Sequence, residues 1–114
     1  MLAVIVMTFC LPAAPASDVW TPPPAWLDRT MQLESSGNRW AVGDGGRSRG
    51  PYQIQRRIWQ HYGGRKPWST WAHNPGESRR VARIILDQCA SACKRVGKPV
   101  TFTNVRWFYR HGGF

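Results

Sequence analysis

Apolar residues recur at the spacing of an α-helix in four stretches of this chain, residues 25–34, 51–62, 75–96 and 103–110. Between the first two stretches lies a loop rich in glycine, and no stretch of any length alternates apolar and polar residues as a half-buried strand would. There are no internal repeats. The pattern therefore predicts a mainly α fold.

The third stretch carries the clearest helix boundaries. Asn74 is a good N-cap, Pro75 suits the first helical position, and Glu77 completes a pattern that resembles a capping box. Gly97 ends the helix. Glu77 is thereby explained as a capping residue, which leaves Glu34 as the only glutamate without a structural role.

The N-terminal part of the chain predicts an exported protein. Residues 2–11 form an apolar run and precede Ala-Pro-Ala at 14–16, which fits the cleavage site of a signal peptide over residues 1–17. A basic segment before the apolar run is missing, and a short buried helix is the alternative. The run is too short to span a bilayer, which needs about 20 residues. We expect a Pro-rich linker at 18–24, one domain at 25–114, no transmembrane segment after removal of the leader, and a secreted or periplasmic protein.

The charge of the chain is strongly one-sided, with 16 Lys and Arg against 6 Asp and Glu, a formal net charge of +10 and a pI near 10.8. Such a charge predicts a polyanionic partner, either a bacterial cell wall with its acidic polymers or a nucleic acid. No block of like charges forms a basic tail.

Cys89 and Cys93 are four residues apart in the third predicted helix. This spacing disfavours a disulfide within the helix, and no second pair of ligands for a metal lies nearby. We expect buried, unpaired thiols, no metal site and no cofactor.

Glu34 has the features of a general acid. It follows Leu27 by seven residues and Met31 by three, so it shares their apolar helix face, where desolvation raises the pKa of a carboxyl group. It also lies at the C-terminal end of the helix, where the macrodipole disfavours a negative charge. A glutamic acid that is protonated near neutral pH can donate a proton to a glycosidic oxygen. The alternative is an exposed glutamate at a frayed helix end.

Asp44 is the candidate for a second carboxylate. It is flanked by Gly43, Gly45 and Gly46, which allow the backbone to approach a ligand closely. A solvated aspartate there stays ionised and completes the unequal carboxyl pair that glycosidases use. The alternative is an ordinary Asp-Gly turn.

Several blocks, in this order along the chain, resemble the catalytic core of the lysozyme-like superfamily. They are ESSGN at 34–38, AVGDGG at 41–46, GPYQI at 50–54 with Trp59 after it, and HGG at 111–113. The GPYQI block is similar to invertebrate-type lysozymes and their bacterial relatives, and the ESSGN block to soluble lytic transglycosylases. The chain lacks the asparagine that follows the histidine of the last block in that family, and it lacks the disulfides usual in invertebrate-type lysozymes.

The resemblance implies a small lysozyme-like helical domain with an active-site loop, or a minimal β-hairpin, between the first two helices. It implies Glu34 and Asp44 as the catalytic carboxylates. It also implies a set of substrate-binding residues in the sugar cleft, namely Tyr52, Gln53, Ser48, Gly50 and His111. We add Trp40 as a platform for sugar stacking, because it lies between the two carboxylates in the sequence.

We therefore expect a muramidase that hydrolyses the bond between N-acetylmuramic acid and N-acetylglucosamine in peptidoglycan. A lytic transglycosylase, which would need Glu34 alone and would leave anhydro ends, is the alternative within the superfamily. From other classes, the chain could be a basic nucleic-acid-binding protein or a catalytically inactive wall-binding protein. The nucleic-acid reading leaves the Glu34, Asp44 and GPYQI arrangement unexplained, so we expect no nucleic-acid partner. We expect a monomer.

Overall fold

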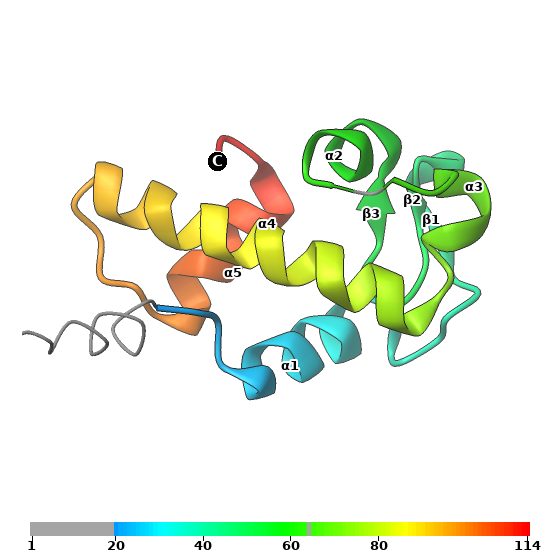
Figure 1. Cartoon of the computed structure of the whole chain (residues 1–114). Helices are drawn as coiled ribbons and strands as arrows, with labels where there is room; N and C mark the ends of the chain where they lie inside the picture. Colours follow the sequence, from blue (N-terminus) through cyan, green and yellow to red (C-terminus); the bar gives the residue numbers. More distant parts are fainter. Residues whose placement is uncertain (1–19, 64) are drawn as a thin grey trace, which may run out of the picture.

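The computed structural model describes residues 20–63 and 65–114, which form five α-helices and one three-stranded antiparallel sheet (Figure 1). The prediction of a mainly helical fold is confirmed. The predicted leader at 1–17 and the first two residues of the predicted linker lie outside the described residues.

The elements follow one another from the N-terminal to the C-terminal end. Their bounds are α1 Pro24–Ser35, β1 Val42–Gly43, the 3₁₀ turn η2 Asp44–Gly46, β2 Ser48–Arg49, β3 Ile54–Gln55, α2 Arg56–His61, α3 Trp68–Trp71, α4 Pro75–Arg95 and α5 Phe102–His111.

The sheet occupies part of the sequence in which we predicted helix and loop. The helix predicted at 51–62 begins only at Arg56, because Gln53 has a φ of 51° and the next two residues pair with β2. The register pairs Val42 with Arg49 and Ser48 with Gln55. Strands of two residues are too short to show an alternating pattern, so the hydrophobic pattern did not reveal them; only the resemblance named a minimal β-hairpin in this region as one of two possibilities. The single-turn helix α3 lies between the second and third predicted helices, where no helix was predicted.

Helix α4 is the centre of the core. Its N-cap Asn74 accepts a hydrogen bond from the backbone N–H of Glu77 at 2.9 Å, as predicted, while the Glu77 side chain pairs with Arg80 instead of reaching back to the cap. Helix α5 packs along α4, and α1 and the sheet flank its N-terminal half (Figure 1). The buried residues of α4 include Val81, Ala82, Ile85, Leu86, Cys89 and Cys93.

Both cysteines of α4 are buried and free, as predicted. Burial raises the pKa of the Cys89 thiol above its ordinary range, so this side chain acts as a small apolar group in the core. Trp68 and Trp71 are partly buried and pack against the core.

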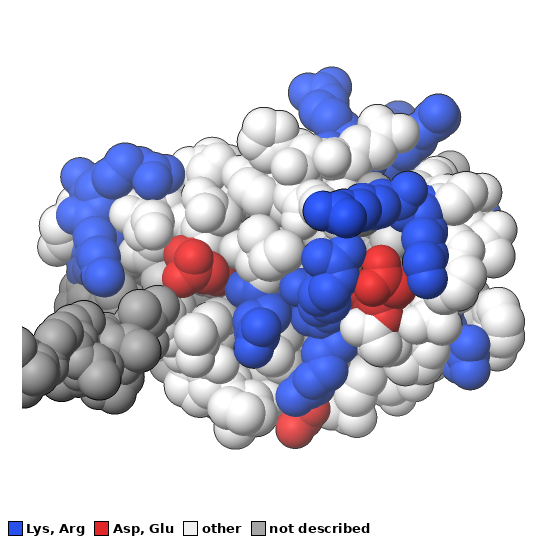
Figure 2. Space-filling model, in the orientation of Figure 1, with Lys and Arg blue, Asp and Glu red and all other residues white. Residues whose placement is uncertain are grey.

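Basic side chains spread over the outside of this core. Figure 2 shows Lys and Arg side chains across the face of the molecule on which α4 lies. Arg79, Arg80 and Arg83 of α4 line a groove together with the chain that precedes α1. Of the helices within residues 20–63 and 65–114, none has the length and apolar character needed to cross a membrane.

Candidate active site

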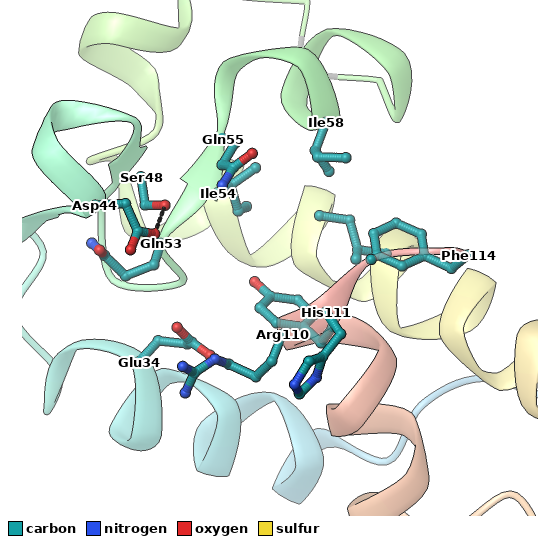
Figure 3. Close-up of a pocket in the computed structure, with 13 residues that line it drawn as sticks. Glu34, Asp44, Ser48, Gln53, Ile54, Gln55, Ile58, Arg110, His111 and Phe114 are labelled. Atoms are coloured by element: carbon teal, nitrogen blue, oxygen red, sulfur yellow. Dashed lines mark hydrogen bonds between the residues drawn. The ribbon is translucent and has the colours of Figure 1, made fainter.

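A cleft of about 190 Å³ lies where α1, the sheet and the C-terminal end of the chain meet (Figure 3). Its polar lining residues come from separate parts of the chain, and an apolar side is formed by isoleucines and the final phenylalanine. The lining residues are Glu34, Asp44, Ser48, Gln53, Ile54, Gln55, Ile58, Ile85, Tyr109, Arg110, His111, Gly112 and Phe114. Both predicted catalytic carboxylates are among them.

Glu34 enters the cleft from the last turn of α1. Its side chain is only 11% exposed, and its Oε2 lies 3.0 Å from Nη2 of Arg106 on α5. The next residue, Ser35, donates a hydrogen bond to the carbonyl oxygen of Pro51 at 2.8 Å, which holds the end of α1 against the turn before β3. Glu34 is therefore a largely buried, ion-paired residue, and the alternative of an exposed glutamate at a frayed end does not hold.

The environment raises the pKa of Glu34 above its ordinary value of 4.5. Burial is the largest cause, because it disfavours the charged carboxylate. The cations of Arg106 and Arg110 act in the opposite direction, and the negative charge of Asp44 adds to the rise. Desolvation thus outweighs the ion pair, which is the balance that a general acid needs.

Asp44 faces Glu34 from the opposite wall of the cleft (Figure 3). It begins η2 with a φ of 52°, and Gly45 follows with a φ of 66°, so the backbone turns sharply at this point. The Ser48 hydroxyl of β2 donates a hydrogen bond of 2.6 Å to Oδ2 of Asp44. This bond fixes the carboxylate relative to the sheet.

Gln53 and His111, two of the residues that we predicted to bind substrate, also line the cleft, but both have partners within the protein. Nε2 of Gln53 donates to the carbonyl oxygens of Gly50 at 2.9 Å and Ala41 at 3.2 Å, so this side chain ties the sheet together. The His111 ring stacks on Trp107 with 4.3 Å between centroids. Both side chains are therefore held in fixed positions at the rim of the cleft.

Three residues that we predicted in the cleft lie elsewhere. Tyr52 is 2% exposed, and its hydroxyl accepts a hydrogen bond from Arg79 of α4 at 3.1 Å. Gly50 is buried where the sheet packs on the main chain at Ala72. Trp40 is 65% exposed and stacks on His73, outside the residues that line the cleft.

Helix α5 contributes residues that the sequence analysis missed. Tyr109 lines the cleft and donates a hydrogen bond from its hydroxyl to the carbonyl oxygen of Tyr52 at 2.7 Å; burial holds the pKa of this phenol well above its usual range. Arg106 and Arg110 are four residues apart, so they share a helix face. That spacing was visible in the sequence, but nothing local indicated that their face meets Glu34.

The described residues contain no group of three or more His, Cys, Asp or Glu side chains placed to hold a metal ion. Comparison of the chain with protein-family models, with curated proteins and with solved structures gives no match.

Proposed function

We propose that this protein is a muramidase that hydrolyses the bond between N-acetylmuramic acid and N-acetylglucosamine in peptidoglycan, with Glu34 as the general acid. The observation that carries the proposal is the pair of unlike carboxyl groups across one cleft, Glu34 desolvated on α1 and Asp44 on a turn of the sheet. Most glycosidases use two carboxyl groups whose environments give them different pKa values.

In this mechanism the protonated Glu34 donates its proton to the leaving glycosidic oxygen. Burial supports this role because it favours the protonated form. Asp44 on the other wall stabilises the developing positive charge of the sugar ring, attacks it, or activates a water molecule. The Ser48 hydroxyl keeps the Asp44 carboxylate in a fixed orientation for any of these roles.

The size of the cleft fits part of a polymer. Its volume of about 190 Å³ lies below the ~300–1,000 Å³ of pockets that enclose a whole small ligand. It is a place for about one sugar ring, with the rest of a glycan chain running over the surface. The net charge of +10 supports an anionic cell-wall surface as the partner that concentrates the enzyme on its substrate. Export to the periplasm or the exterior is part of the same proposal.

Cleavage of purified peptidoglycan, followed by turbidity and by mass analysis of the fragments, tests the proposal. We expect Glu34→Gln to reduce the rate by at least ~100-fold, since a general acid contributes about 10²–10⁴-fold. Glu77→Gln is the matched control, because it makes the same chemical change at a glutamate that is ion-paired with Arg80 outside the cleft. Near wild-type lysis by Glu34→Gln would reject the assignment.

The products of cleavage distinguish the chemistries that two carboxyl groups in one cleft could support. Hydrolysis gives fragments with reducing ends, and their formation should decline strongly in Asp44→Asn. Anhydro ends that persist in Asp44→Asn would instead identify a lytic transglycosylase that uses Glu34 alone. Absence of any cleavage, together with retention on the insoluble wall, would identify a wall-binding protein.

A further inference from the structure

Helix α5 brings two cations to the side of the cleft that holds Glu34. Arg106 is 16% exposed and is the ion-pair partner of Glu34. Arg110 lies one turn later, lines the cleft, and is exposed. In Figure 3 its side chain extends toward Glu34. Among the described residues no carboxylate forms a salt bridge with Arg110.

The charges around the cleft balance only while Glu34 is ionised. Glu34 and Asp44 then offset Arg106 and Arg110. A general acid acts in its protonated form, and in that form the cleft carries one excess positive charge on the α5 side. Among the described residues that line the cleft, Glu34 and Asp44 are the only acidic ones, so the protein itself does not supply the missing anion. The form that acts as an acid is therefore the form that favours an anionic group on the ligand.

We propose that Arg110 is a specificity-determining residue that binds a carboxylate carried by the sugar chain beside the bond to be cleaved. This inference rests on the proposed function and names the feature of the substrate that the cleft recognises. A guanidinium group donates two parallel hydrogen bonds to a carboxylate, which gives both affinity and orientation. Acidic glycans are thereby selected over neutral ones such as chitin.

Two carboxylates in peptidoglycan have this chemistry. One is the lactyl carboxylate of N-acetylmuramic acid, where no peptide is attached. The other is a carboxylate of the stem peptide, which, when present, is joined to the lactyl group through an amide bond and so removes the lactyl carboxylate. The position of Arg110 next to the general acid requires only that the carboxylate lies close to the sugar ring.

Calorimetric titration of the full chain with three probes tests the inference. The probes are N-acetylglucosaminyl-N-acetylmuramic acid with a free lactyl carboxylate, the same disaccharide with a stem peptide, and chitobiose. The bond within these disaccharides is not the one that the proposed muramidase cleaves, so binding is measured without turnover. We expect at least one acidic probe to bind about 5- to 10-fold more tightly than chitobiose at low salt, a modest factor because Arg110 is exposed. The acidic probe that shows the preference identifies the carboxylate.

Arg110→Gln should remove most of this preference, whereas Arg95→Gln, which deletes the same charge at the far end of α4, should keep it. Equal affinities for all three probes in the wild type would overturn the inference, and so would a preference that survives in Arg110→Gln. The proposed function fails separately: it fails when the wild type does not cleave peptidoglycan, whatever the three affinities are.

Discussion

Replacement of Gly50 by alanine gives the sharpest test of how the sheet is attached to the helices. Gly50 follows β2 with a φ of 83°, and its N–H donates to the carbonyl oxygen of Ala41 at 2.9 Å. A Cβ atom at this position would lie 2.6 Å from the carbonyl carbon of Ala72 and would overlap the carbonyl oxygen. Because these are main-chain atoms, no change of rotamer can relieve the contact.

Gly97→Ala is the matched control. Gly97 has a φ of 75° just after α4, and nothing lies within 4 Å of a Cβ built there. The left-handed conformation costs alanine about 1–2 kcal/mol. Alanine also lowers the conformational entropy of the unfolded chain, which stabilises the folded protein by about 0.4–1 kcal/mol and offsets part of this loss. We therefore expect Gly97→Ala to lower the free energy of unfolding by about 1 kcal/mol.

Gly50→Ala carries the same conformational cost and adds the overlap with Ala72. Forcing extra atoms into a packed site costs about 1–3 kcal/mol and occasionally more, and a contact between two backbones belongs at the upper end. We expect a total loss of about 3–5 kcal/mol, a large part of the ~5–15 kcal/mol that stabilises a typical domain.

Urea unfolding, followed by tryptophan fluorescence and far-UV circular dichroism, measures both losses. Cleavage of peptidoglycan by Gly50→Ala should fall only as far as the folded fraction falls, because Gly50 does not line the cleft. Equal unfolding midpoints for the two variants would refute the close approach of the sheet to Ala72. Loss of cleavage in fully folded Gly50→Ala would return this residue to the sugar cleft.

Three further predictions follow from the site and the caps. The pKa of the Glu34 carboxyl should lie above 4.5 in the wild type, should rise further in Arg106→Met, which removes a cation that lowers it, and should fall in Asp44→Asn, which removes an anion that raises it. NMR titration of this carboxyl measures the midpoint in all three proteins. Identical midpoints would contradict the stated causes. Tyr52→Phe should lower the free energy of unfolding by about 1 kcal/mol, because the hydrogen bond between the hydroxyl and Arg79 of α4 is lost. The affinity for glycan should stay as in the wild type, and a clear loss of affinity in a titration would place the hydroxyl in the cleft. Asn74→Ala should destabilise the protein by about 1 kcal/mol in urea unfolding, and an unchanged midpoint would show that its cap bond contributes nothing.

The parts of the fold that the sequence predicted are those set by local interactions. The start of α4 follows from Asn74 and Pro75, and its end lies within two residues of Gly97. The GPYQI block was misassigned to a helix because its conformation depends on pairing with β2 and on the left-handed conformation of Gln53, neither of which leaves a local pattern.

In the candidate site, too, the features set by local sequence could be predicted, whereas those set by the packing of distant segments could not. The burial of Glu34 could be predicted because its helix face was visible from Leu27 and Met31. Its partner Arg106 is 72 residues away in the chain, so the ion pair depends on how α5 packs. Tyr52 was placed in the cleft only because the GPYQI block resembles the family's sugar-binding segment, and the fold alone determines that its hydroxyl points toward α4.

The position of Tyr52 has a mechanical consequence. Its hydroxyl bonds Arg79, which in turn pairs with Asp28 of α1 at 2.7 Å, while its carbonyl oxygen accepts the hydroxyl of Tyr109 from α5. Tyr52, which directly precedes Gln53 and β3 on the sheet side, is thus bonded to the helices of the Glu34 side through both its side chain and its main chain. The spacing of the two carboxylates across the cleft therefore depends on bonds made by a residue that does not itself line the cleft.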